Sequence, residues 1–141
     1  MTAPARDAIT EELLALEKAA LTRWCAGDPG GFLELSAPDV VYFDPFLERR
    51  LDGLAALTAY YEAIRGQVSA DRFEIIDPCV HTCALGDRKP HMAVLTYNFV
   101  SWGGSDNALR WNCTEVFRRD PPGFRIISTH WSFTKPALQR A

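Results

Sequence analysis

The sequence lacks the features of a membrane or exported protein. It has no apolar run near the ~20 residues that cross a bilayer, and residues 1–7 lack the apolar core of a signal peptide. We therefore expect a cytoplasmic protein that makes no contact with a membrane. Its composition, with 48% hydrophobic and 23% charged residues, is that of an ordinary globular domain.

The sequence also has no concentration of positive charge. Its 15 lysines and arginines are outnumbered by 18 acidic residues, and the net charge is -3. A protein that follows a phosphate backbone needs clustered Lys and Arg, whereas the basic pairs Arg49-Arg50 and Arg118-Arg119 are short. We predict that these pairs cap strand ends or contact carboxylates, and that nucleic acid is not a partner.

Cysteine is scarce, with thiols at Cys25, Cys79, Cys83 and Cys113. A domain near 150 residues buries roughly 68 to 70% of its unfolded surface, so this chain can form a core without disulfides, and we expect buried free thiols. Cys79, His81 and Cys83 fall on one face of a predicted strand, but their spacing is not a zinc-binding one. We therefore predict no metal site.

Established catalytic motifs are also absent. The sequence has no glycine-rich phosphate loop after a strand, no Gly-x-Ser-x-Gly, no His-Glu-x-x-His and no calcium-binding loop. A nucleophilic cysteine is disfavoured, because Cys25 and Cys113 lie in apolar patterns that raise the pKa of a thiol. We expect a protein that works without a cofactor.

The hydrophobic pattern predicts helices in the first half of the chain and strands in the second. Apolar residues recur every three or four positions over 8–26, and shorter helical patterns cover 28–35 and 53–66. β-branched and aromatic residues predict a strand at 40–44, with a shorter one at 49–51. The longer strands that follow are predicted at 72–81, 92–102, 107–119 and 124–134.

Turn residues separate these longer strands, and no linker or internal repeat divides the chain. We therefore predict a single α+β domain over residues 1–141, with helices packed on one face of a curved, mostly antiparallel sheet. The ends, 1–7 and 135–141, are expected to be flexible.

The last two predicted strands bring a carboxyl group and an imidazole toward one interior. Side chains alternate between the two faces of a strand, so Glu115 shares a row with Cys113 and Phe117. The matching row of the next strand holds Phe124, Ile126, Ser128, His130 and Ser132. We predict that Glu115 and His130 face the same interior, and that the opposite rows, which are partly apolar, meet a partner subunit.

Three passages of the chain, taken in order, carry a family resemblance. They are Ala26-Gly27-Asp28, then Val41-Tyr42-Phe43-Asp44-Pro45 with Gly53 and Tyr60-Tyr61, then residues 114–119 leading to 124–132. Together they resemble the NTF2-like superfamily, the cone-shaped fold of ketosteroid isomerases, SnoaL-type polyketide cyclases, scytalone dehydratase and the association domain of calmodulin-dependent kinase II. The third passage looks closest to the kinase association domain.

The resemblance implies that the N-terminal helices pack in the concave face of the sheet, that an apolar pocket lies there, and that the convex face forms a homodimer. Aligned on the Asp-Pro dipeptide, Asp44 matches the general base of the ketosteroid isomerases, and Glu115 matches their second, protonated carboxyl group. The position of their helix tyrosine falls near Ala20, so the hydroxyl donor of those enzymes is missing.

We take four residues as candidates for catalysis. Asp44 would be the base, His130 or Tyr97 would donate a hydrogen bond, and Glu115 would orient the donor. Each has a structural interpretation as well. Asp44 can end its strand, and Glu115 can pair with an arginine such as Arg110. His130 and Tyr97 can be satisfied residues of the core.

The predicted pocket suits a flat or cyclic organic ligand. Its wall is predicted to hold Trp24, Tyr42, Leu95, Phe99, Trp111, Cys113, Phe117, Ser128 and Ser132. The predicted homodimer face holds Asn98, Asn112, Thr114, Thr129 and Trp131. Three functions stay open: a cofactor-independent isomerase, cyclase or dehydratase that acts by proton transfer, a non-catalytic ligand-binding protein, and an oligomerisation module like the kinase association domain.

Overall fold

The computed structural model describes residues 7–86, 88–104 and 108–135. Its helices are α1 (Ala8–Cys25), α2 (Gly30–Leu35) and α3 (Leu54–Ala63), close to the predicted ranges. Asp7 is the N-cap of α1 and accepts a hydrogen bond from the Thr10 backbone N–H at 2.8 Å. Within the described ranges, no helix is long and apolar enough to cross a membrane. The predicted flexible ends, apart from Asp7 and Lys135, lie outside the described residues.

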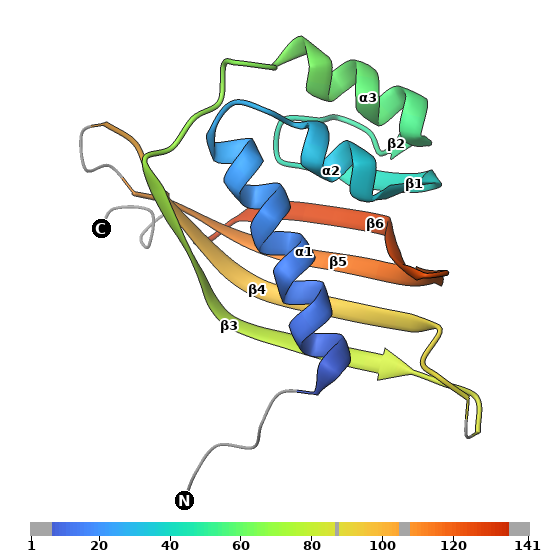
Figure 1. The fold of residues 1–141 in the computed structure, drawn as a ribbon. Helices are drawn as coiled ribbons and strands as arrows, with labels where there is room; N and C mark the ends of the chain where they lie inside the picture. The colour runs from blue at the N-terminus through green and yellow to red at the C-terminus, as the bar shows by residue number, and fades with distance from the viewer. Residues whose placement is uncertain (1–6, 87, 105–107, 136–141) are drawn as a thin grey trace, which may run out of the picture.

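Within the described part of the chain, six strands form one curved sheet in the order β2-β1-β6-β5-β4-β3. Their bounds are β1 (Ser36–Phe43), β2 (Leu51–Asp52), β3 (Arg72–Cys83), β4 (Met92–Trp102), β5 (Ala108–Asp120) and β6 (Gly123–Phe133). Among these strands of the described residues, β1 and β6 pair in parallel, and the other neighbours are antiparallel. Helix α1 crosses the concave face, while α2 and α3 lie toward β1 and β2 (Figure 1). The predicted α+β fold is confirmed.

The turn after α1 depends on one glycine. Gly27 has a φ of +87°, which glycine adopts without a steric penalty, and a Cβ at this position would lie 3.2 Å from the Gly66 Cα. The Gly66 N–H donates to the Gly27 carbonyl at 2.9 Å, and the Ala70 N–H donates to the Cys25 carbonyl at 3.0 Å. These bonds attach the segment after α3 to the C-terminal end of α1.

The hydrophobic core lies between α1 and the concave face of the sheet. Helix α1 buries Leu13 and Leu21, and the facing strands bury Leu95, Phe117 and Ile126. Complete burial of each such side chain stabilises the fold by about 1.5 to 3 kcal/mol. Packing against α1 therefore explains why the concave face carries the apolar rows of β4, β5 and β6.

A β-bulge in β6 changes which side chains face this core. Phe117 pairs with Ile126, but the preceding residue of β5, Val116, pairs with Ser128, so Ile127 is an extra residue in β6. The inward row therefore passes from Ile126 to Thr129 and Trp131 instead of continuing through Ser128 and His130. Thr129 is buried, whereas His130 is exposed. The prediction that His130 faces the interior with Glu115 is wrong, because strict alternation ends at the bulge.

Two of the basic residues contact carboxylates, as predicted. The Arg118 guanidinium contacts both oxygens of Asp39 at 2.8 and 2.9 Å, which links β5 to β1 across the intervening β6. Arg50 contacts Asp52 at 2.6 Å. These side chains are largely exposed, so water and salt screen each pair and its contribution to stability is small.

The prediction of buried thiols holds for only part of the chain. Cys113 is buried and Cys25 is half-buried, whereas Cys79 and Cys83 are exposed. The last two lie on the outer side of β3, where a second irregularity between Ile76 and Cys79 shifts the register. Burial raises the pKa of the Cys25 and Cys113 thiols, as the sequence predicts for apolar surroundings.

The core contains a pair of buried carboxyl groups. Glu17 from α1 and Glu115 from β5 are fully buried and interact electrostatically. Glu115 accepts hydrogen bonds from the Thr129 hydroxyl at 3.2 Å and from the Cys113 thiol at 3.8 Å. Among the described residues, the Glu17 oxygens have no hydrogen-bond partner of standard geometry. Burial raises the pKa of both groups, and the Glu115 charge raises the pKa of Glu17 further.

We expect Glu17→Gln to change how the stability of the protein depends on pH. The folded-state pKa values are raised above the ordinary value of 4.5, so the protonated pair stabilises the fold fully below that value, and this contribution is lost as pH rises toward the folded-state values. As pH rises above 4.5, the free energy of unfolding should therefore fall less in the variant than in the wild type. Urea denaturation followed by tryptophan fluorescence measures it.

Glu12→Gln is the matched control, because Glu12 is an exposed glutamate on the same helix. Its profile of stability against pH should follow that of the wild type. Parallel profiles for the wild type and Glu17→Gln would contradict the presence of a protonated carboxyl pair in the folded protein.

Candidate functional site

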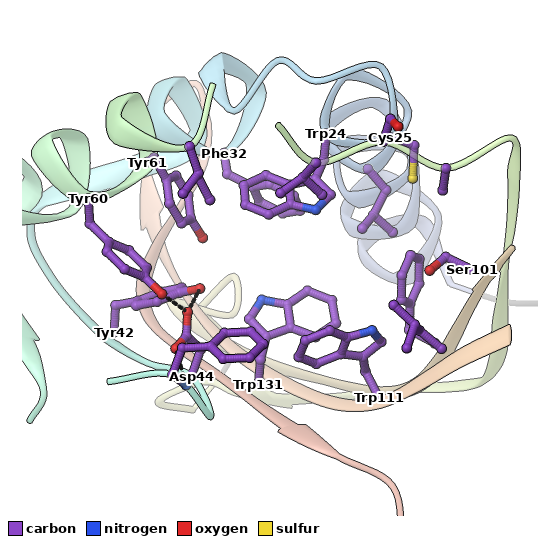
Figure 2. Close-up of a pocket in the computed structure, with 18 residues that line it drawn as sticks. Trp24, Cys25, Phe32, Tyr42, Asp44, Tyr60, Tyr61, Ser101, Trp111 and Trp131 are labelled. Atoms are coloured by element: carbon purple, nitrogen blue, oxygen red, sulfur yellow. Dashed lines mark hydrogen bonds between the residues drawn. The ribbon is translucent and has the colours of Figure 1, made fainter. Parts of the chain in front are cut away.

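A cavity of about 540 Å³ lies between the C-terminal end of α1, helix α3 and one end of the sheet. Figure 2 shows its lining side chains, which project from both the helical side and the sheet. Nine of the 18 lining residues are aromatic: Trp24, Phe32, Tyr42, Phe46, Tyr60, Tyr61, Phe99, Trp111 and Trp131. The concave face is thus filled with core at one end and open to a ligand at the other.

The aromatic rings are held in fixed orientations by contacts with one another. The Trp24 and Tyr61 ring centroids are 5.0 Å apart on the helical side. On the sheet, Trp111 and Trp131 meet at 6.0 Å with an interplanar angle of 83°. Tyr42 joins the two sides through an edge-to-face contact with Tyr61 at 5.3 Å. The aromatic rings of the cavity wall therefore hold one another in place.

Asp44 is the charged residue of the cavity wall. It follows β1 directly, where Pro45 cannot continue the strand pairing. Its Oδ2 accepts from the Tyr60 hydroxyl at 2.6 Å and from the Tyr42 hydroxyl at 3.0 Å, and its Oδ1 accepts from the Phe46 N–H at 2.8 Å. Figure 2 shows the two tyrosine hydroxyls converging on this carboxylate. Both interpretations of Asp44 therefore fit its geometry, because it ends a strand and also lines the cavity.

The cavity tyrosines stay protonated over the ordinary pH range. Burial raises the pKa of Tyr42 and Tyr61 well above the usual value, and burial together with the hydrogen bond to Asp44 raises the pKa of Tyr60. Each hydroxyl therefore remains a hydrogen-bond donor. Tyr42 and Tyr60 direct theirs to Asp44, which holds the carboxylate in one orientation.

The rest of the wall is apolar apart from a few small polar groups. Ser69, Ser101 and the half-buried thiol of Cys25 face the space, and no lysine, arginine or histidine of the described ranges lines it. In the same ranges, no group of three His, Cys, Asp or Glu side chains could hold a metal ion. The arrangement can receive the apolar body of a ligand among the rings and its polar end at Asp44.

The structure brings together five of the residues proposed from the sequence. Asp44, Trp24, Tyr42, Phe99 and Trp111 all line the cavity. Other predicted wall residues face the concave side but are packed into the core without reaching the cavity, namely Leu95, Cys113 and Phe117. Alternation along a strand predicts which face of the sheet a side chain lies on. It does not predict whether that side chain lies in the packed core or reaches the cavity.

Three of the predicted site residues lie on the outer face of the sheet. Ser128, His130 and Ser132 are paired with Val116, Thr114 and Asn112, and their side chains point away from the cavity. His130 instead stacks on Phe43, with ring centroids 5.2 Å apart. The bulge at Ile127 is the cause. The same shift corrects the predicted homodimer face, because Thr129 and Trp131 point into the concave side.

Glu115 and Tyr97 face inward, but neither lines the cavity. Both are buried in the core, where Glu115 meets Glu17, one helical turn before the cavity residue Leu21 on α1. Tyr97 packs against Trp131 with ring centroids 6.0 Å apart. Asp44, the proposed donors His130 and Tyr97, and the proposed orienting group Glu115 therefore do not meet in one space.

Several cavity residues were missing from the prediction. Strict alternation predicts Trp131 on the outer face, because the bulge leaves no clear mark in the sequence. Tyr60 and Tyr61 were noted only as part of a family pattern, although their adjacency on a helix that follows Asp44 could have indicated hydroxyl donors. Phe46 lies in the irregular segment after β1, where no period applies.

Comparison with solved structures finds close relatives along nearly the whole chain. A candidate ketosteroid isomerase from Parabacteroides distasonis is 43% identical, with a TM-score of 0.78 over 93% of this chain and 92% of that one. An NTF2-like protein of unknown function from Pseudomonas putida is 25% identical, with a TM-score of 0.75 over 98% and 96%. A comparison with curated proteins finds no match.

More distant structures share the fold. A candidate association domain of calcium/calmodulin-dependent protein kinase II from Xanthomonas campestris is 20% identical, with a TM-score of 0.70 over 96% of this chain and 94% of that one. A family model, the SnoaL-like domain, matches residues 18–136. That range includes the C-terminal part of α1, every strand and all of the cavity-lining residues. The chain therefore belongs to the SnoaL-like domain family, within the NTF2-like superfamily.

Proposed function

We propose that the protein binds a small, flat organic molecule in the aromatic cavity and exchanges a proton with it through Asp44. The observation that carries this proposal is the Asp44 carboxylate, fixed by hydrogen bonds in the mostly apolar wall that the described residues form around a cavity of about 540 Å³. A large apolar cavity with a few convergent polar groups is the usual form of a small-molecule site.

The hydrogen bonding of Asp44 leaves room for a ligand. A carboxylate accepts hydrogen bonds at about four positions, and Tyr42, Tyr60 and the Phe46 N–H occupy three. One acceptor position therefore remains, on Oδ1. A C–H or O–H group of a bound ligand that reaches this position can transfer its proton to Asp44.

The comparisons support the same class of chemistry. The Parabacteroides distasonis relative bears the name of a ketosteroid isomerase, and the matched family is SnoaL-like. Ala20, where the ketosteroid isomerases are expected to place a tyrosine, is buried and offers no hydroxyl. In our proposal Tyr61, whose hydroxyl is directed toward the cavity in Figure 2, is the donor that stabilises a developing oxyanion.

We expect the wild-type protein to catalyse exchange of the hydrogens next to the carbonyl of a bound cyclic ketone with deuterium from heavy water. Asp44→Asn should lower the exchange rate about 100-fold or more, because general base catalysis contributes about 10² to 10⁴. Proton NMR of the ketone measures the exchange, and circular dichroism checks that the variant folds.

Asp77→Asn is the matched control, because Asp77 is an exposed aspartate on β3 outside the cavity wall. Its exchange rate should equal that of the wild type. A ketone that binds in the cavity without exchange in the wild type would contradict proton transfer and favour the non-catalytic ligand-binding function.

We also propose a homodimer through the convex face of the sheet. On this face the Asn98 side chain donates to Asn112 at 2.7 Å, and Asn112 donates to Ser132 at 3.1 Å, so a polar ladder crosses β4, β5 and β6. Thr114 is exposed beside it. These side chains carry no charge, and charged residues are depleted at the centre of interfaces. Thr129 and Trp131 take no part because they face the cavity side.

We expect Asn112→Arg to convert a dimer into a monomer, because a cation near the middle of this face would meet its own copy across a two-fold axis. Multi-angle light scattering after size-exclusion chromatography measures the mass. Ala19→Arg, on the exposed side of α1, should leave the mass unchanged. A wild-type monomer would refute the dimer, and a larger ring would favour an oligomerisation module.

A further inference from the structure

We infer that the aromatic cavity selects an organic cation, such as a substituted ammonium, over a neutral or anionic molecule of the same shape. This inference rests on the proposed function only in taking the cavity as the ligand site. The inference specifies the charge of the ligand, whereas the proposed proton transfer at Asp44 does not specify it.

The first ground is the charge balance of the wall. Asp44 carries the negative charge, and no lysine, arginine or histidine of the described ranges lines the cavity. The groups that hydrogen-bond to Asp44 are two tyrosine hydroxyls and a backbone N–H, all of them neutral. The negative charge of Asp44 is therefore not balanced by a positively charged side chain of the wall. The apolar surroundings strengthen its electrostatic attraction for a cation.

The second ground is the number and placement of the rings. An aromatic ring has a negative face, and a cation within about 6 Å of its centroid is attracted, most strongly by tryptophan. Trp24 lies on the helical side of the cavity and Trp111 and Trp131 on the sheet (Figure 2). The ring planes of Trp111 and Trp131 are nearly perpendicular, at 83°, so these two rings form a corner of the cavity wall.

The geometry disfavours an anionic ligand for the same reasons. A ligand carboxylate would meet the Asp44 carboxylate and the negative ring faces, and the hydroxyl and indole N–H groups of the wall would receive it without a positive charge. Tyr42 and Tyr60 already donate to Asp44, so their protons are engaged. A neutral ligand of the same shape would keep the apolar contacts but would lack the attraction of opposite charges at Asp44.

The test compares ligands that differ in charge and hardly in shape. Benzyltrimethylammonium and neopentylbenzene have the same arrangement of heavy atoms, with a cationic nitrogen in the first and a neutral carbon in the second. Phenylacetate supplies the anion. Titrations are followed by the indole N–H signals in nitrogen-15 NMR spectra of the protein, because three tryptophans line the cavity.

We expect the cation to bind at least about tenfold more tightly than its neutral isostere, and phenylacetate to bind more weakly than either. Asp44→Asn should reduce the ratio of the two affinities about tenfold, and Trp131→Leu should also reduce it, since a cation loses a ring face there. The exposed control Asp77→Asn should keep the wild-type ratio.

The possible outcomes separate this inference from the proposed function. Equal binding of the cation and its isostere, or tighter binding of phenylacetate, would overturn the cation preference and leave the cavity as a ligand site. If the Asp44→Asn variant folds and keeps the wild-type ratio of the two affinities, the role of Asp44 in the cation preference is overturned. An absence of binding by all three compounds would overturn both the inference and the proposed ligand site.

Discussion

The register of β6 against β5 is the constraint on which the interior of this protein depends. One extra residue, Ile127, shifts the inward row from Ser128 and His130 to Thr129 and Trp131. Because side chains have a period of two, a shift of one residue exchanges the two faces of everything that follows. The bulge thus supplies a hydroxyl to the buried carboxyl pair and an indole to the cavity, while it sends an imidazole to the outer face.

The concave face of the sheet is divided into a packed region and an open region. Along β4 and β5 it is packed against α1, which fills the space and buries Glu17 beside Glu115. Toward the C-terminal end of α1 the sheet and the helices are held apart by large rings, and the segment after α3 is attached to α1 through Gly27. The fold thereby combines a dense core with an open end that can receive a ligand.

The carboxyl groups in these regions have opposite surroundings. Glu17 is buried without a hydrogen-bond donor of standard geometry among the described residues, so a proton on the carboxyl group avoids the cost of a buried charge. Asp44 is half-buried and receives three hydrogen bonds, which satisfy the carboxylate where it stands. Carboxyl groups of one fold can therefore differ in behaviour according to the groups that surround each of them. Membership of the SnoaL-like family and the named relatives support a small-molecule-binding or isomerase-like fold.

The sequence by itself determined the helices, the strands and the family, because hydrophobic period, turn residues and the Asp-Pro strand end are local signals. It also placed Asp44, Trp24 and Trp111, which lie where alternation holds. The tertiary structure decided that Trp131 and not His130 faces inward, and that Glu115 meets Glu17 instead of Asp44. A bulge and the path of α1 across the sheet arise from the packing of segments far apart in the chain, and no local pattern records them.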